Sequence, residues 1–157
     1  MKQAHPARAA VSKLESHTGF WLRFVSNHVS HTFARKLLQS GVTAAEWVVL
    51  RQMYGEDELS PSVLANRIGM TRGAASKLVD RLLAKDLLTR QERSDDRRFQ
   101  NIALTRAGRQ LVPKLAAIAD QNDEEFFQPL TTRERQALVT TMKKLVQAHN
   151  LRKLPTE

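Results

Sequence analysis

The segment from Thr71 to Lys77 carries side chains that suit contacts with a nucleic acid. Arg72 and Lys77 can bond guanine edges or phosphates, and Ser76 can hydrogen-bond to either. Thr71 and Gly73 are small, so they leave the approach to a base edge open. If this segment begins a helix, its N-terminus also favours a nearby phosphate. The pattern indicates DNA contacts, with an ordinary solvated helix face as the alternative.

A second basic group lies between two short predicted strands. Arg93, Arg97 and Arg98 follow Arg90 within a few residues, and Asp96 stands among them. A narrow minor groove has an enhanced negative potential that attracts an inserted arginine. Asp96 can bond the backbone of a tight tip and thereby fix the direction of Arg98. A flexible charged loop is the alternative interpretation of this stretch.

These side chains require a helix-turn-helix unit followed by a hairpin. Ser60 and Pro61 supply an N-cap and a first-turn proline for one helix, Gly69 a turn, and Thr71 the cap of the next helix. Ser60 and Arg81 complete the predicted DNA-contacting set. The pattern of caps and apolar residues predicts helices over about 8–39, 43–53, 60–68, 71–85, 105–127 and 131–146, and strands over 87–93 and 99–104. Pro113 is expected to kink the fifth helix or weaken one of its turns.

Composition limits the class of protein. The 157 residues have a net charge of +9, which favours a polyanionic partner, and their apolar fraction of 41% is that of an ordinary globular chain. The chain has no cysteine, so disulfides and thiolate metal sites are excluded. Because it shows no signal-peptide core and no apolar run long enough for a bilayer, we expect a cytoplasmic protein without a membrane partner.

The first predicted helix carries a stripe of apolar and ring-bearing side chains. Members of the stripe recur at spacings of three and four: Leu14, His17, Trp21, Phe24, His28 and His31. A helix of about 30 residues is about 45 Å long, more than so small a domain can cover. The sequence therefore predicts burial of this stripe against a second copy of the chain.

Several of these residues form a motif that resembles the MarR family of transcription regulators. The stretch from Leu82 to Arg90 is similar to the family's passage from recognition helix to wing. Asp96-Arg97-Arg98, then Leu104-Thr105 and Gly108, match its D-x-R…LT-x-x-G wing signature at the right spacing. The similarity extends over nearly the whole chain, from about residue 11 to 148.

The resemblance implies a mainly α fold, a winged helix-turn-helix with six helices, a two-stranded wing and a helical dimerisation region. It implies a homodimer built from the first, fifth and sixth helices, with residues 1–42 and 106–157 in the dimerisation region and 43–105 in the DNA-binding domain. In the family the fourth helix reads the major groove and the wing arginine, here Arg98, reaches the minor groove. Small aromatic or anionic ligands typically bind between the two regions and reduce DNA affinity.

Two departures from the family pattern matter. Asp86 stands where glycine is common, at a helix end that often needs a left-handed backbone; aspartate tolerates this better than most residues. The absence of cysteine excludes the subgroup that senses peroxides through a thiol.

An aromatic pocket is the predicted effector site. Six residues make up this set: Trp21, Phe24, His28, His31, Trp47 and Arg51. In it, a histidine or Arg51 would meet a ligand carboxylate or phenolate. The alternative is that the rings only pack the dimer core. A metal-responsive regulator using His28 and His31, three apart on a helix, is a further alternative; we predict no metal and no cofactor.

The sequence thus predicts a repressor that binds an imperfect palindrome in double-stranded DNA and responds to a small ligand. A winged-helix module for protein contacts is the competing class. No glycine-rich phosphate loop, nucleophile elbow or paired catalytic acids can be recognised, so we predict that the chain is not an enzyme.

Overall fold

The computed structural model describes residues 11–92 and 100–151. Within these ranges the chain forms six α-helices, a short 3-10 helix and a two-stranded antiparallel sheet. The elements are η1 (Leu14–Ser16), α1 (Thr18–Leu38), α2 (Ala44–Met53), α3 (Pro61–Arg67), α4 (Arg72–Ala84), β1 (Leu88–Glu92), β2 (Gln100–Leu104), α5 (Arg106–Phe127) and α6 (Thr132–Ala148). The predicted fold class, a winged helix-turn-helix with six helices and a two-stranded wing, is confirmed.

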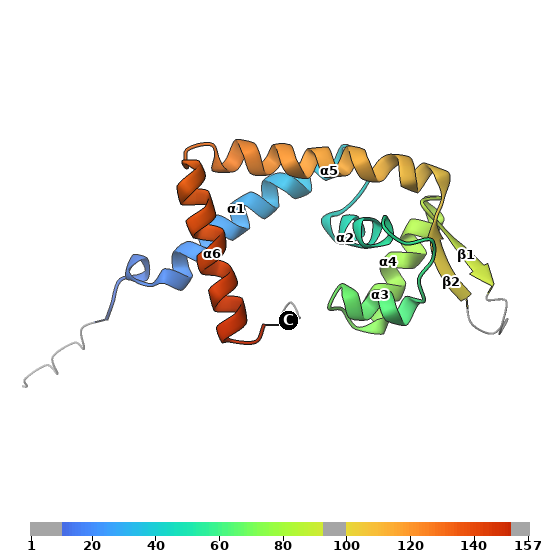
Figure 1. Ribbon diagram of the computed structural model, residues 1–157, viewed down its shortest axis with the longest axis horizontal. Coiled ribbons are helices and arrows are strands. Elements are labelled where there is room, and N and C mark those ends of the chain that lie inside the picture. Colours follow the sequence, from blue (N-terminus) through green and yellow to red (C-terminus); the bar gives the residue numbers. More distant parts are fainter. Residues whose placement is uncertain (1–10, 93–99, 152–157) are drawn as a thin grey trace, which may run out of the picture.

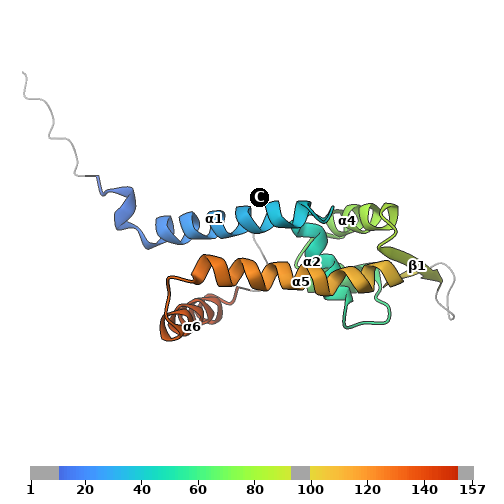
Figure 2. The same cartoon turned by 90° about the horizontal axis from the view of Figure 1, so that it is seen from above.

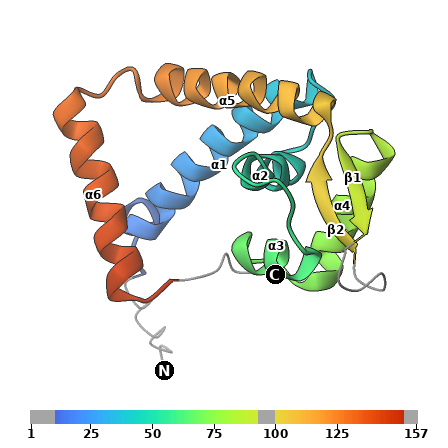
Figure 3. The ribbon, with the colours of Figure 1, turned by 45° about the vertical axis from the view of Figure 1, so that its right-hand side comes forward.

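The helices α1, α5 and α6 form an open frame. The winged unit, which consists of α2, α3, α4 and the sheet, lies at one end of this frame. Figure 1 shows α5 running along the top of the molecule, with α1 crossing beneath it and α6 descending from its C-terminal end. The view from above shows α1 and α5 side by side along much of their length (Figure 2). In Figure 3, α2, α3, α4 and the sheet gather under the other end of α5, away from α6. The frame thus holds the helix-turn-helix at a distance from α6.

Capping hydrogen bonds explain where α2, α5 and α6 begin. The Thr43 hydroxyl accepts from the Glu46 N–H, and the Glu46 carboxylate accepts from the Thr43 N–H at 2.9 Å. Thr131 and Glu134 form the same reciprocal box at the start of α6. Such boxes satisfy backbone donors that a helix leaves without partners. Thr105 caps α5 by accepting from the Gly108 N–H at 3.0 Å.

The first helix is shorter than predicted. α1 begins at Thr18, because His17 has an extended backbone with φ −95° and ψ 123° that ends the separate η1 turn. The Trp21 indole donates to the Glu15 carbonyl at 2.9 Å, which holds η1 against the first turn of α1. The expectation that one helix runs on from about Arg8 is therefore wrong for residues 11–17, and residues 1–10 lie outside the described ranges.

The core belongs to the winged unit. It contains Leu37 from the end of α1, Val49, Leu50 and Met53 from α2, Leu64 from α3, Leu78 and Leu82 from α4, Ile102 from β2, and Val112 and Leu115 from α5. In contrast, α6 has no buried residue and α1 has one, Leu37, in the described part of the chain. The frame helices therefore leave much of their apolar surface exposed.

Other details depart from the sequence expectations or refine them. The helix α5 continues through Pro113, because the buried Val112 and Leu115 on either side hold it against the core. Ala103 is buried together with Ile102 and Leu104, so three consecutive residues of β2 belong to the interior. Asp86 adopts φ 55°, the left-handed backbone expected at this position. None of the described helices combines the length and apolarity that a bilayer crossing requires.

Candidate nucleic-acid interface

Local hydrogen bonds define where α3 and α4 begin. The Ser60 hydroxyl accepts from the Val63 N–H and the Thr71 hydroxyl accepts from the Ala74 N–H, so both predicted contact residues act as N-caps. Gly69, between the helices, has φ 69°, a conformation that L-residues with a side chain rarely adopt. The cap residues are thus placed at the ends of α3 and α4 where backbone N–H groups point outward.

The recognition helix α4 has one buried face and one exposed face. Its buried side chains are Ala75, Leu78, Val79 and Leu82. Its exposed residues include most of the predicted contact set: Arg72, Gly73, Ser76, Lys77 and Arg81. In the described part of the chain, none of the three cations on this face has a carboxylate within ion-pair distance. The face therefore offers positive charge and small polar groups to solvent.

The remaining charged residue on this face, Asp80, is paired with the wing. Arg90 on β1 donates from Nη2 to the Asp80 Oδ1 at 2.8 Å, and its Nη1 lies 3.5 Å from the Gln100 Oε1 on β2. This pair neutralises the only acid in α4 and ties the helix to both wing strands. The sequence groups Arg90 with the wing cations, whereas in the structure its guanidinium is engaged within the protein.

The wing is anchored from both sides. β1 and β2 pair antiparallel with Leu88 opposite Leu104 and Glu92 opposite Gln100. Leu59 adds a bridge to Ile102 through two backbone hydrogen bonds of 2.9 and 2.8 Å. The predicted tip residues Arg93, Asp96, Arg97 and Arg98 lie outside the described residues, so their roles stay predictions.

Glu46 joins the frame to the recognition helix, a role that its sequence position did not indicate. Its side chain is 1% exposed and accepts from Lys85 Nζ at 2.7 Å, and the same ammonium donates to the Gly41 carbonyl at 2.8 Å. Burial raises the pKa of Glu46, but the hydrogen bonds from Lys85 and from the Thr43 backbone outweigh it, so the pKa lies below its ordinary value. The α1–α2 loop and the C-terminal end of α4 are thus held by one ammonium group.

The aromatic set proposed as an effector site is only partly brought together. Phe24 lies between Trp21 and His28, with ring centroids 6.3 and 4.4 Å away, and the His28 Nδ1–H donates to the Phe24 carbonyl at 2.7 Å. His31 is exposed farther along α1. Trp47 packs against the core from α2, and Arg51 is exposed.

The structure places an apolar groove beside Trp21 that the sequence did not reveal. Trp21, Leu22 and Val25 of α1 form one wall of this groove, which has a volume of about 440 Å³. Phe126, Phe127, Leu130 and Leu138 lie opposite. From the sequence, the helical spacing of these residues indicates only an apolar face. The contact between the two walls of the groove depends on how α1, α5 and α6 pack together.

In the part of the chain that the structure describes, the histidines on α1 do not lie close to other potential metal ligands. Over residues 11–92 and 100–151, no group of three or more histidine and carboxylate side chains comes close enough to hold a metal ion. His28 also has one ring nitrogen committed to a backbone carbonyl.

The chain is similar to known transcription regulators. The sequence model of the MarR family matches residues 40–98, which span α2 to the wing. The HTH-type transcriptional regulator SarZ of Staphylococcus haemolyticus is 26% identical over 135 residues, covering 86% of this chain and 90% of the relative. Among solved structures, Bordetella bronchiseptica BpsR, described with the regulation of its DNA binding by 6-hydroxynicotinic acid, has a TM-score of 0.75 at 26% identity and covers 87% of this chain and 97% of its own.

The fold also matches a solved protein–DNA complex. The structure of the Staphylococcus aureus MepR–DNA complex has a TM-score of 0.75 at 24% identity, with 84% of this chain and 98% of MepR covered. The family model, the similarity to SarZ over 135 residues and the observed helix order agree with one another. By the match over residues 40–98 and the similarity to SarZ, the chain resembles the MarR family of transcription regulators, and its fold is a winged helix-turn-helix.

Proposed function

We propose that the protein is a homodimeric repressor that binds an imperfect palindrome in double-stranded DNA. The observation that carries this proposal is the exposed face of α4. It presents Arg72, Lys77 and Arg81 without ion pairs in the described part of the chain, beside small residues and next to a wing fixed by the Asp80–Arg90 pair. A helix with these features fits the major groove, where cations contact phosphates and guanine edges.

The residues divide into base-reading and positioning groups. Arg72 and Ser76, on the first two turns of α4 with Gly73 beside them, are assigned to base edges. Phosphate contacts are assigned to the N-caps Thr71 and Ser60, because a helix start favours a nearby phosphate, and to the long cations Lys77 and Arg81. In the wing, Arg97 and Arg98 are assigned to the minor groove, with Asp96 supporting the tip.

The exposed apolar surface of the frame supports a homodimer. Trp21, Leu22 and Phe24 on α1 are each half exposed, and α6 exposes Met142, Leu145 and Val146. Large exposed apolar patches mark interfaces in soluble proteins. We assign residues 1–42 and 106–157 to this dimerisation region and 43–105 to the DNA-binding domain. Two α4 helices would then enter successive major grooves about 34 Å apart.

A small molecule is proposed to control the DNA affinity. The BpsR structure, described with regulation by 6-hydroxynicotinic acid, supports an aromatic or anionic effector for this chain. The candidate contacts remain Trp21, Phe24, His28, His31, Trp47 and Arg51. Such a ligand acts by preferring a spacing of the two winged units that does not fit DNA.

Fluorescence anisotropy tests the proposal on duplexes from the upstream region of the gene, with excess nonspecific DNA and several salt concentrations. We expect specific binding that weakens steeply with salt, since phosphate contacts release counterions. Lys77→Ala should weaken binding on all duplexes and lower the salt slope by about 1. The matched control is Lys114→Ala, an exposed lysine on α5.

Arg72→Ala should relax the sequence preference at one position of each half-site, worth about 1–3 kcal/mol of discrimination. An unchanged preference profile contradicts the base-reading role. Weak binding that is equal on every duplex contradicts the proposed function and favours a winged module for protein contacts. Repression is checked with a reporter under the bound promoter, whose expression should rise when the protein is removed.

A further inference from the structure

The side chain of Asn122 on α5 is buried, and its amide oxygen has no hydrogen-bond partner among the described residues. Its side chain is 3% exposed and lies against α1, where Nδ2 donates to the Val29 carbonyl at 3.4 Å. Its Oδ1 is buried and accepts no hydrogen bond from the described part of the chain. Because a buried acceptor without a donor is costly, such an atom in a native protein calls for an explanation.

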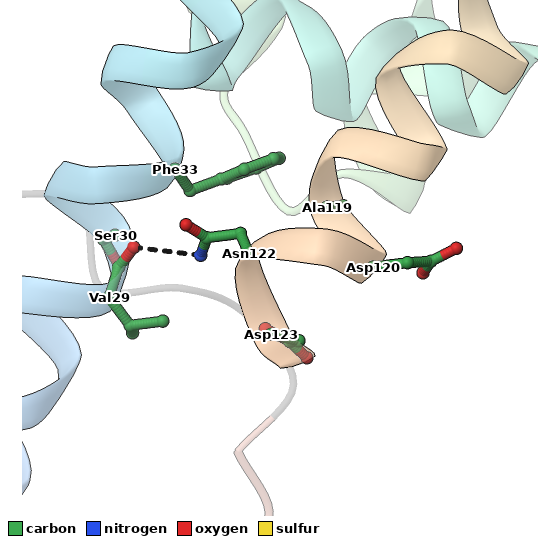
Figure 4. A pocket seen from close by; sticks show the side chains of 7 residues that line it. All are labelled: Val29, Ser30, Phe33, Ala119, Asp120, Asn122 and Asp123. Carbon is green, nitrogen blue, oxygen red and sulfur yellow. Dashed lines mark hydrogen bonds between the residues drawn. The ribbon is translucent and has the colours of Figure 1, made fainter. Parts of the chain in front are cut away.

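This amide oxygen borders a pocket between α1 and α5. The pocket has a volume of about 260 Å³. Its lining is Val29, Ser30 and Phe33 from α1 with Ala119, Asp120, Asn122 and Asp123 from α5. Figure 4 shows the amide oxygen of Asn122 on the side of Phe33, while the amide nitrogen is bonded toward Val29. The site therefore combines an aromatic ring with a buried hydrogen-bond acceptor.

The rim of the pocket is acidic in a strongly basic protein. Glu124 and Glu125, next along α5, are paired with Arg135 and Lys36. Over the described residues, no basic side chain lies within ion-pair distance of Asp120 or Asp123. Asp120 thus keeps its charge toward solvent, and Asp123, which also interacts electrostatically with Arg135, adds a second carboxylate to the rim, although the whole chain carries +9.

We propose that this pocket binds a small organic cation whose N–H donors sit on a flat apolar body, such as an arylalkyl ammonium. The ammonium would donate to the Asn122 Oδ1 and be attracted by Asp120 and Asp123, and the body would lie against Phe33 and Val29. A cation near an aromatic ring gains further attraction. Among the residues that the structure describes, no cationic side chain lines the pocket, so the site disfavours a carboxylate. It is therefore separate from the anionic effector site proposed above.

Three probes of nearly equal shape test the charge preference on the full chain: benzylamine, benzyl alcohol and benzoate. Binding is measured by ligand-detected NMR and by calorimetry, without DNA. We expect benzylamine to bind at least tenfold more tightly than benzyl alcohol and benzoate not to bind. Asp120→Asn should weaken benzylamine at least threefold, whereas the matched control Asp57→Asn, an exposed acid of the winged unit, should leave it unchanged.

Asn122→Leu removes the acceptor while keeping the side-chain volume similar, and it should abolish binding. If this variant does not fold, the Asp120 and Asp57 variants decide. Equal affinity for the three probes, or no binding of benzylamine to the wild type, overturns the proposal, as does a crystal structure with benzylamine in which only a water bonds the Asn122 Oδ1. Because no DNA is present, failure here is distinguishable from failure of the proposed DNA binding.

Discussion

Replacing Lys85 with methionine should destabilise the protein, because it leaves the Glu46 carboxylate buried without its cation. The carboxylate is 1% exposed, and the ammonium that bonds it at 2.7 Å belongs to a side chain that is 37% exposed. Removing one partner of a fully buried pair costs about 3–5 kcal/mol. Solvent screening at Lys85, and the Thr43 N–H that Glu46 keeps, reduce the expected loss to about 2 kcal/mol.

Thermal unfolding at fixed protein concentration measures this loss. For a chain of this size, 1 kcal/mol shifts Tm by about 2–4 °C, so Lys85→Met should lower Tm by about 4–8 °C. The matched control is Lys36→Met, which removes the cation from the exposed Glu125 and should have a much smaller effect. Glu46→Gln combined with Lys85→Met completes a double-mutant cycle, and the pair should show a clear coupling energy.

The same pair predicts a pH dependence with a defined sign. The pKa of Glu46 lies below its ordinary value of 4.5 in the folded protein, so its contribution to stability is present above about pH 4.5 and is lost as the pH falls further. In Lys85→Met the largest remaining effect is burial, which raises the pKa. The Tm difference between variant and wild type should therefore shrink between pH 7 and pH 4. A Tm difference that stays constant with pH, or a Tm equal to that of Lys36→Met, would refute the stabilising role of the Glu46–Lys85 pair.

Three further changes test the wing and its supports. Asp80→Asn should weaken DNA binding severalfold, because it releases the wing from α4. Adding Arg90→Gln should cause little further loss, since both changes remove the same ion pair. Additive losses of affinity in an anisotropy titration would contradict this expectation. Gly108→Ala should cost about 1–3 kcal/mol by chemical denaturation, because its Cβ would collide with the Leu87 carbonyl oxygen; a neutral effect shows that α5 can shift. Asp86→Gly should raise stability by up to about 1 kcal/mol by relieving the left-handed backbone at φ 55°; a loss of stability means that the Asp86 side chain is needed.

The sequence alone determined the order of the elements and most of their ends. Capping boxes at Thr43 and Thr131, the Ser60 cap and the turn at Gly69 all act through neighbours within a few residues, so local spacing is sufficient to predict them. The exposed face of α4 followed in the same way, because helical periodicity assigns Ala75 and Leu78 to the opposite side.

Only the tertiary structure decided which side chains far apart in the chain meet. From the sequence, Arg90 is one of the wing cations, whereas in the structure it forms an ion pair with Asp80 at 2.8 Å. The sequence indicates Glu46 only as part of a capping box, whereas in the structure its carboxylate also accepts a hydrogen bond from Lys85. The glycine of the family motif, Gly108, proves necessary because the first turn of α5 passes close to the Leu87 carbonyl. Helical periodicity predicts that a side chain faces inward. Which side chain it then contacts depends on how the helices pack, and local sequence does not determine this packing.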